Sequence, residues 1–444
     1  MKSRAALPPC FEEGLTGVVA RINAHVATCT DGFWFMTDPH FPKNAGHAGA
    51  MIAELAGKVP LDKVFCGGDI PYAYVADGKT PCREELRRNC EEFGKSFVEP
   101  VVHARLRAYM VRGNHDFTIC RDTTFKTGTT LSGEETRRWI LGKFTDRDVV
   151  ANDADPEACC YYFDNPDARI RYIVADNTDS AESGDIAWGV RTGMREPQLR
   201  WIAETALGTL GDGWNAVLIH HAPMAGLVGT DADERVYADF RHICEAYQNR
   251  TVTDIFGKRY DFAEAKGRIL LSLSGHHHAE RQTFQNGILH VTEPCDMLDS
   301  GIDYKFGAGP WCGDLPTRKE GGPYEHTFDA VQLDTERGLV HFTRVGGGQD
   351  RTIHLVPLRL RAGGCLSLET RHLAGPVTWG SHDADGIDWR TNPISKWCPI
   401  AVFRNERTSV TPDGELHGIR HGEAVAIAMD GCLNKEIWPV TVEA

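Results

Sequence analysis

Five short polar motifs along the chain carry side chains that can bind metal ions. Each motif follows an apolar stretch, and together they supply carboxylates, one amide oxygen and several imidazoles. They are Asp38-Pro39-His40, Gly68-Asp69, Gly113-Asn114-His115-Asp116, His220-His221 and Gly275-His276-His277-His278. Oxygen and nitrogen donors without a thiolate at ligand spacing suit manganese, iron or zinc ions rather than a cysteine-based structural zinc. We therefore predict a metal centre built from these motifs.

The spacing within the motifs favours convergence on one site. Asp38 and His40 alternate, as do His276 and His278, so each pair leaves an extended strand on the same side. Asp69 follows a Gly-Gly turn, and its carboxylate is suited to bridge two ions. Two ions roughly 3.5–4 Å apart can bind a phosphate group and lower the pKa of a water that attacks in line. The motifs therefore predict metal-assisted hydrolysis of a phosphate ester.

The ordered set of motifs resembles the calcineurin-like metallophosphoesterase family. This family includes purple acid phosphatases, protein Ser/Thr phosphatases, class III cyclic-nucleotide phosphodiesterases and repair nucleases. Its pattern is D-x-H, G-D, G-N-H-[DE], H and G-H-x-H, and all five parts occur here in that order. The resemblance covers about residues 30 to 345. A single D-x-H or G-D carries no information, but the ordered set is highly specific.

The resemblance implies a dinuclear centre holding Mn²⁺, Fe²⁺/Fe³⁺ or Zn²⁺, with the attacking water between the two ions. In the family's order, the ligands of the first ion, the bridging ligand and the ligands of the second ion correspond to Asp38, His40 and His278, then Asp69, then Asn114, His220 and His276. The resemblance also implies that His115 does not bind metal but assists departure of the leaving group. Asp116 would then be a carboxylate that orients His115.

Two positions of the motifs remain open from the sequence. His220 is the preferred ligand at the fourth motif because it directly follows the apolar strand, and His221, in the form H-x-P with Pro223, is the alternative. His277 stands at the family's variable position, so we expect it to point away from the metals, with contact to substrate as the alternative. His47, shortly after the first motif, is expected on a helix surface or as a helix cap, with approach to substrate as the alternative.

Alternation of strands and helices must position these motifs. Apolar runs predict strands at residues 33–36, 63–66, 108–111, 170–175, 216–219 and 269–273, with helical patterns between several of them and a hairpin at 330–343. Such alternation predicts an α/β layered fold, in which ligands gather at the carboxyl ends of strands. The resemblance implies the family's four-layer α/β/β/α sandwich, with two mixed sheets face to face and helices outside.

The pattern of apolar and polar residues changes at about residue 349. Short alternating runs separated by turn residues follow to the end of the chain, which is typical of a β-rich fold. We predict a metallophosphoesterase domain at 1–348 and a smaller all-β domain at 349–444, the latter a candidate binding or assembly module.

Composition narrows the classes of partner. The chain has 444 residues, 41% of them hydrophobic, and a formal net charge of −14. This acidity argues against a broad grip on nucleic acid, although it leaves room for a local positive patch. The sequence shows neither a secretory signal nor a run of apolar residues long enough to span a membrane. We expect a cytoplasmic protein, without a membrane partner, that acts on a small phosphate ester.

The predicted activity is therefore metal-dependent hydrolysis of a phosphate ester, and the sequence leaves the choice between phosphomonoester and phosphodiester open. An alternative from another class is a binding or assembly protein that acts through the C-terminal β-domain, with the hydrolase site as an accessory. The complete ligand set argues against a vestigial site.

Overall fold

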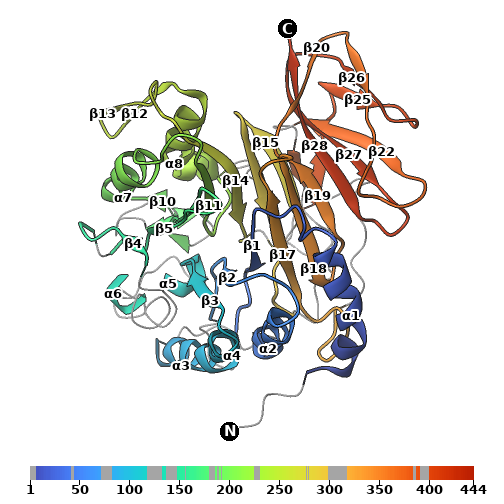
Figure 1. Cartoon of the computed structure of the whole chain (residues 1–444). Coiled ribbons are helices and arrows are strands. Elements are labelled where there is room, and N and C mark those ends of the chain that lie inside the picture. Colours follow the sequence, from blue (N-terminus) through green and yellow to red (C-terminus); the bar gives the residue numbers. More distant parts are fainter. Residues whose placement is uncertain are drawn as a thin grey trace.

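The structure, a computed structural model, describes residues 7–41, 45–71, 83–117, 133–136, 148–155, 157–179, 186–187, 190–191, 193–224, 231–276, 278, 280–298, 318–383, 387–390 and 400–444. Two β-sheets packed face to face form its centre, helices cover their outer faces, and a strand-rich region follows at the C-terminus (Figure 1). The architecture is the expected four-layer sandwich with a smaller C-terminal β region.

The first sheet has the strand order β22-β27-β28-β19-β18-β17-β1-β2-β3, and β20 pairs with β28. Its strands are β1 (Asp31–Met36), β2 (Lys63–Cys66), β3 (Arg107–Met110), β17 (Thr327–Asp334), β18 (Leu339–Gly346), β19 (Arg351–His354), β20 (Leu358–Arg361), β22 (Thr378–Asp383), β27 (Gly422–Met429) and β28 (Lys435–Glu443). β1, β2 and β3 run parallel, so their carboxyl ends meet at one edge of the sheet.

The second sheet has the order β15-β16-β14-β11-β6-β5-β4. Its strands are β4 (Val150–Ala151), β5 (Tyr161–Asn165), β6 (Ile170–Val174), β11 (Asn215–Ile219), β14 (Arg268–Ser274), β15 (Arg281–Gln285) and β16 (Ile288–Thr292). β11 lies between β6 and β14 and is parallel to both. The carboxyl ends of β11 and β14 therefore lie side by side as well.

Shorter strands form small accessory sheets. Their bounds are β7 (Thr178–Asp179) with β10 (Gly193–Met194), β8 (Ile186–Ala187) with β9 (Val190–Arg191), β12 (Val252–Ile255) with β13 (Lys258–Asp261), β21 (Cys365–Ser367), β25 (Thr408–Val410) and β26 (Glu415–Gly418) together, and β23 (Ile387–Arg390) with β24 (Ile400–Phe403).

Helices complete the two outer layers. Those of the N-terminal third are α1 (Pro9–Asn23), α2 (Ala45–Ala56), α3 (Arg83–Phe93), the π-helical turn η1 (Gly94–Val98), α4 (Glu99–His103), α5 (Asn114–Phe117) and α6 (Gly133–Thr136). Those beside the second sheet are α7 (Glu196–Trp201), its π-helical continuation η3 (Ile202–Leu207) and α8 (Asp231–Asn249). Leu199, Leu207 and Phe240 pack there against Leu218 in one apolar cluster.

Aromatic side chains from both sheets fill the space between them. The ring of Tyr109 on β3 stacks on Phe163 of β5 with centroids 4.1 Å apart, and Phe33 of β1 meets Tyr172 of β6 edge to face at 5.5 Å. The Tyr161 hydroxyl also donates to the carbonyl oxygen of Met110 at 2.9 Å. Such aromatic pairs add about 0.5–1.5 kcal/mol each beyond the area that they bury. The sandwich is therefore held firmly beneath the strand ends.

The C-terminal region extends the first sheet. β19 pairs with β18 and also runs parallel to β28, so the hydrogen-bonded ladder crosses residue 349. The region also has a small apolar cluster of its own, which includes Leu360, Leu416 and Trp438. The boundary between residues 348 and 349 stays a prediction.

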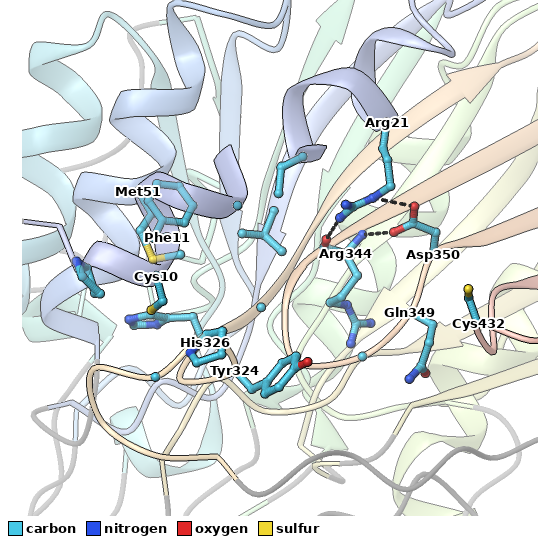
Figure 2. A pocket seen from close by; sticks show the side chains of 18 of the residues that line it. Cys10, Phe11, Arg21, Met51, Tyr324, His326, Arg344, Gln349, Asp350 and Cys432 are labelled. Carbon is cyan, nitrogen blue, oxygen red and sulfur yellow. Dashed lines mark hydrogen bonds and ion pairs between the residues drawn. The ribbon is translucent and has the colours of Figure 1, made fainter. Parts of the chain in front are cut away.

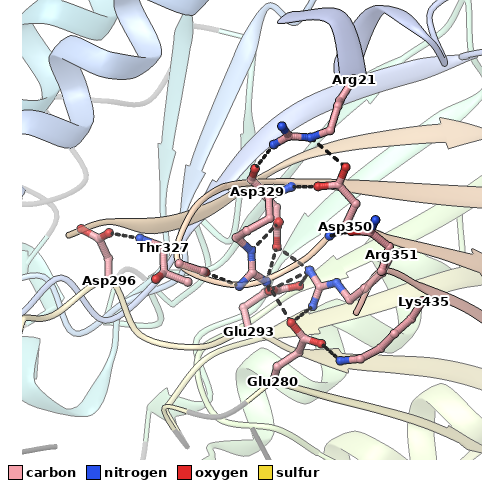
Figure 3. A network of polar contacts seen from close by, with 12 residues as sticks. Arg21, Glu280, Glu293, Asp296, Thr327, Asp329, Asp350, Arg351 and Lys435 are labelled. Carbon is pink, nitrogen blue, oxygen red and sulfur yellow. Dashed lines mark hydrogen bonds and ion pairs between the residues drawn. The ribbon is translucent and has the colours of Figure 1, made fainter. Parts of the chain in front are cut away.

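A buried network of charges lies where the C-terminal region meets the sandwich (Figure 3). It joins Arg344, Arg351 and Lys435 to Glu280, Glu293 and Asp329. Lys435 Nζ lies 2.8 Å from Glu280 Oε1, and Arg351 Nη2 lies 3.0 Å from Glu293 Oε1. Three basic side chains face three carboxyl groups, and burial together with Asp329 raises the pKa of Glu293 well above its ordinary value.

The six predicted strands agree with β1, β2, β3, β6, β11 and β14 to within two residues. The predicted strand 63–66 coincides with β2, and the predicted hairpin is the antiparallel pair of β17 and β18. The ten cysteines among the described residues are free. Within the described part of the chain, no helix has both the length and the apolar character needed to cross a lipid bilayer.

Candidate metal centre

The five motifs meet where the strands of the two sheets end. Asp38 follows β1, Asp69 follows β2, and Asn114 follows β3, while His221 and His276 follow β11 and β14. Backbone hydrogen bonds tie these loops together: the N–H of His40 donates to the carbonyl oxygen of Asp69 at 3.0 Å, and that of Gly275 to His221 at 2.8 Å. Parallel pairing of the strands thus brings distant motifs to one edge of the sandwich.

One group of donor atoms comes from the first and fifth motifs. His278 Nε2 lies 3.2 Å from Asp38 Oδ1 and 3.3 Å from His40 Nε2. His40 Nε2 is 3.9 Å from the same Asp38 oxygen. Asp38 is held by Thr37, whose hydroxyl donates to Oδ2 at 2.6 Å, and by the backbone N–H of His276 at 2.9 Å. This carboxylate therefore presents Oδ1 to the two imidazoles.

A second group of donor atoms comes from the other motifs. His221 Nε2 lies 3.0 Å from Asn114 Oδ1 and 3.2 Å from Asp69 Oδ2. His276 completes this group, since one donor atom from each of Asp69, His221 and His276 lies within 4.8 Å of the others. Asp69 Oδ2 is also 3.7 Å from His40 Nε2. Asp69 therefore lies between the two groups.

The donor set fits two metal ions. Ligand atoms about 2.0–2.2 Å from a shared tetrahedral ion lie roughly 3.3–3.5 Å from one another. The separations of 3.2 and 3.3 Å in the first group and of 3.0 and 3.2 Å in the second are close to this range. Imidazole, carboxylate and amide donors suit zinc, manganese or iron.

The structure corrects the expectation for the fourth motif. His220 lies outside both donor groups, because its Nδ1–H donates to the carbonyl oxygen of Ala222 at 2.8 Å and its Nε2 lies 2.7 Å from Ser272 Oγ. Its ring also meets Phe240 on the helix side of the second sheet. Its neighbour His221 is the residue that reaches Asn114 and Asp69. His221 therefore replaces His220 in the candidate ligand set.

Asp116 has a different set of partners from the one expected. Its carboxylate accepts hydrogen bonds from the backbone N–H groups of Asp69 at 3.0 Å, Ile70 at 2.7 Å and Gly113 at 2.7 Å. These contacts clamp the second motif to the third. The expected contact with the ring of His115 is not among the hydrogen bonds of the described residues, so Asp116 positions the loops rather than that imidazole.

His115 lies at the open side of the centre. Its backbone N–H donates to Asp69 Oδ1 at 2.7 Å, and its Nε2 is 3.9 Å from Asp69 Oδ2. Its side chain is 30% exposed, whereas those of Asp38, Asp69 and His221 are at most 2% exposed. An incoming substrate can therefore reach His115, whose side chain is more exposed than that of His278 at 20%.

Opposite charges within the cluster shift the pKa values of its members. Burial alone would lower the pKa of His221, but Asp69 and Asp38 raise it to about 9. Burial also opposes ionisation of Asp69, yet His221 and His115 hold its pKa well below the ordinary value. For His276, burial and the neighbouring His221 lower the pKa to about 3. The carboxylates of Asp38 and Asp69 therefore stabilise positive charge at this position. A bound metal ion would replace the proton on His221.

The backbone at the candidate ligands is in the left-handed region. The φ values are 51° at Asp38, 44° at His40, 53° at Asp69, 67° at His276 and 54° at His278. Residues other than glycine seldom adopt this conformation, and it persists at functional sites where the surrounding structure enforces it. The strand ends are thus bent to aim these side chains. His277 lies outside the described residues.

Comparison with known proteins gives a family and a set of solved structures. The family model described as calcineurin-like phosphoesterase matches residues 32–280. A dimetal phosphatase from Danio rerio is 14% identical, with a TM-score of 0.49, and the match covers 74% of this chain and 100% of that one. GAP50, the anchor in the inner membrane complex of Plasmodium, is 8% identical, with a TM-score of 0.40 and coverage of 71% and 84%. No curated protein matches the sequence.

Proposed function

The chain belongs to the calcineurin-like phosphoesterase family, and we propose that it hydrolyses phosphate esters at a dinuclear metal centre. The observation that carries this proposal is the position of Asp69, whose Oδ2 lies 3.2 Å from His221 Nε2 and 3.7 Å from His40 Nε2. One carboxylate between two groups of donors is the arrangement that a pair of neighbouring ions requires.

Each group of donors would hold one ion, of the Mn²⁺, Fe²⁺/Fe³⁺ or Zn²⁺ type. The first group is Asp38, His40 and His278, the second is Asn114, His221 and His276, and Asp69 serves both. When bound, two such ions would bind the phosphate oxygens and lower the pKa of the attacking water. The protein's own contribution is the rigid placement of these donors on strand ends.

His115 is the proposed proton donor to the leaving oxygen. Its side chain is 30% exposed, against 20% for His278, and its backbone is fixed by the hydrogen bond to Asp69 Oδ1. A positioned general acid contributes about 10²–10⁴-fold to the rate. Asp116 supports this role indirectly, because it fixes the backbone of Gly113 and Asp69 on either side of the His115 contact.

The test compares p-nitrophenyl phosphate with bis-p-nitrophenyl phosphate as substrates for metal-free protein supplied with Mn²⁺, Zn²⁺ or Fe²⁺. We expect turnover of at least one of them, and the preferred one assigns the protein to phosphomonoesters or phosphodiesters. His115→Ala should lower kcat by about 10²-fold or more with unchanged metal content. His103→Ala, at an exposed position, is the control. Absence of turnover with every metal contradicts the proposed function, and full activity of His115→Ala removes His115 from the mechanism.

The substrate is proposed to be a small phosphate ester, handled in the cytoplasm. The net charge of −14 supports this choice over a nucleic acid, because an acidic surface repels a polyanion. A small ester needs only the positive charge of the bound metals.

A further inference from the structure

A second cluster of metal-binding side chains lies outside the centre described above. It consists of His47 on α2 together with Glu325 and His326, which directly precede β17. One donor atom from each of the three residues lies within 4.8 Å of the others. None of the three belongs to the family's five motifs.

The donor atoms lie near the separations found between ligands of one cation, and His47 Nδ1 and Glu325 Oε1 are hydrogen-bonded to each other. Glu325 Oε1 lies 3.1 Å from His47 Nδ1 and 3.3 Å from His326 Nε2. Ligands about 2.0–2.2 Å from one tetrahedral ion lie roughly 3.3–3.5 Å apart. The backbone N–H of Gly321 donates to the other carboxylate oxygen at 2.7 Å and so fixes Oε1 toward the two imidazoles.

His326 is oriented as a metal ligand. Its Nδ1 lies 3.1 Å from both carboxylate oxygens of Asp296, so the proton of the neutral ring belongs on Nδ1 and the lone pair on Nε2. A carboxylate on the far nitrogen is the usual support of a histidine that binds metal. His326 is buried, and its Nε2 finds no hydrogen-bond partner of good geometry within the described part of the chain.

The charges around the cluster favour a cation. Asp296 and Glu325 are both buried carboxylates. The guanidinium of Arg318 is nearby and donates hydrogen bonds to backbone carbonyl oxygens, among them those of Cys295 and Asp296 at 2.9 and 2.8 Å. Two buried carboxylates beside the imidazoles therefore favour a divalent cation at this position.

An ion can reach the cluster from solvent. The side chain of His47 is 30% exposed. His326 also lines a cavity of about 590 Å³ between α1 and the loops at residues 322–326 and 346–350. Figure 2 shows His326 at the wall of this cavity with Tyr324 and Cys10. Three protein ligands leave room for water on the open side.

We propose that His47 Nδ1, Glu325 Oε1 and His326 Nε2 bind a single divalent transition-metal ion of the zinc or manganese class, as a site separate from the two-ion centre. The site would brace the loop that carries Asp38. Asp296, which supports His326, donates its backbone N–H to the carbonyl oxygen of Thr37 at 2.9 Å, and the next residue, Met297, donates to that of Asp38 at 3.0 Å.

The test counts metal ions per chain in the full-length protein. After equilibrium dialysis against Zn²⁺, elemental analysis should give three ions for the natural protein and for the exposed-site control His103→Ala. His47→Ala should give two, and since His47 lies partly in solvent, this variant is expected to fold. Equal counts for the natural protein and His47→Ala would overturn the proposal.

A second measurement separates this site from the two-ion centre. In Asp69→Ala, which lacks the shared carboxylate, Co²⁺ should still bind at the second cluster with visible absorption, and adding His47→Ala should remove that absorption. Persistence of the same spectrum in the double variant would refute the site. Both readouts are binding measurements, so the result does not depend on whether the protein proves to hydrolyse phosphate esters.

Discussion

Individual side chains at the centre divide into donors and supports. The ring nitrogen of His221 and the carboxylate oxygen of Asp69 lie 3.2 Å apart, so both are candidate donors. The carboxylate of Asp116 instead accepts hydrogen bonds from three backbone N–H groups and so acts as a support. Buried polar atoms must be satisfied, and an atom already satisfied by the protein is a poor ligand. His221 and His220 differ in what their Nε2 atoms face: that of His221 lies among the candidate ligands Asn114 and Asp69, whereas that of His220 lies 2.7 Å from the hydroxyl of Ser272, outside both donor groups.

Substitution of the two adjacent histidines should therefore have opposite effects. His221→Ala should lower bound metal below two ions at the centre and abolish phosphoesterase activity. His220→Ala should retain the metal but lower the free energy of unfolding by about 1–3 kcal/mol, because Ser272 loses its buried partner. Elemental analysis and denaturant unfolding measure the two effects. Metal loss in His220→Ala together with retention in His221→Ala would reverse the assignment.

At the scale of elements, the site depends on how closely the loops after the strands approach one another. A Cβ at Gly275 would meet the side chains of Thr37 and Asp38 well inside van der Waals contact, and one at Gly113 would meet Asp69. Glycine in these two motifs is therefore a packing requirement of the centre. The loops can pass at this distance only because neither position has a side chain.

Gly275→Ala should accordingly displace the Asp38 carboxylate. We expect a loss of about 1–3 kcal/mol in the free energy of unfolding, as in other overpacked sites, and a metal affinity weakened by roughly 10–100-fold, the range for disturbed ligand supports. Gly14→Ala within α1 is the matched control, because nothing lies within 4 Å of its added Cβ. That control should be neutral or stabilising by up to about 1 kcal/mol. Unchanged metal affinity in Gly275→Ala would contradict this account of the motif.

At the scale of the whole molecule, the C-terminal region is tied to the segment that carries the last motif. Lys435 on β28 pairs with Glu280, which stands two residues after His278, and both side chains are at most 5% exposed. Glu280 also contacts Arg344 and Arg351. Because β18 and β19 pair on either side of residue 349, the sandwich and the C-terminal strands share backbone hydrogen bonds as well as charges.

Removal of one charged side chain from this network should lower the stability of the fold. Lys435→Met should lower the free energy of unfolding by about 3 kcal/mol, since breaking a buried ion pair leaves a desolvated charge. Arg359→Met is the comparison, because Arg359 pairs with Glu443 3.3 Å away and both are about half exposed or more. That exposed pair should contribute less than about 1 kcal/mol. Urea denaturation of the two variants measures the difference, and equal losses would show that the network does not join the regions.

The sequence by itself determined the kinds of donor and the strand ends that carry them. The alternation of apolar runs and helical patterns predicted β1, β2, β3, β11 and β14, and the motif order identified the family. These features are local, because they depend on consecutive residues or on a period of two. They could be predicted because each motif directly follows a strand that is apolar in the sequence.

Only the tertiary structure decided which of two neighbouring histidines faces the candidate metal centre. Successive residues of a strand point to opposite faces, and β11 is apolar on both. Val217 and Ile219 pack between the sheets, whereas Leu218 packs toward the helices. His221 lies on the same side as Val217 and Ile219, and His220 lies on the same side as Leu218. Because the strand is buried on both faces, the sequence pattern does not show which side faces the centre. The cluster of His47, Glu325 and His326 could not be seen in the sequence either, because Glu325 comes 278 residues after His47 and only folding brings the two together.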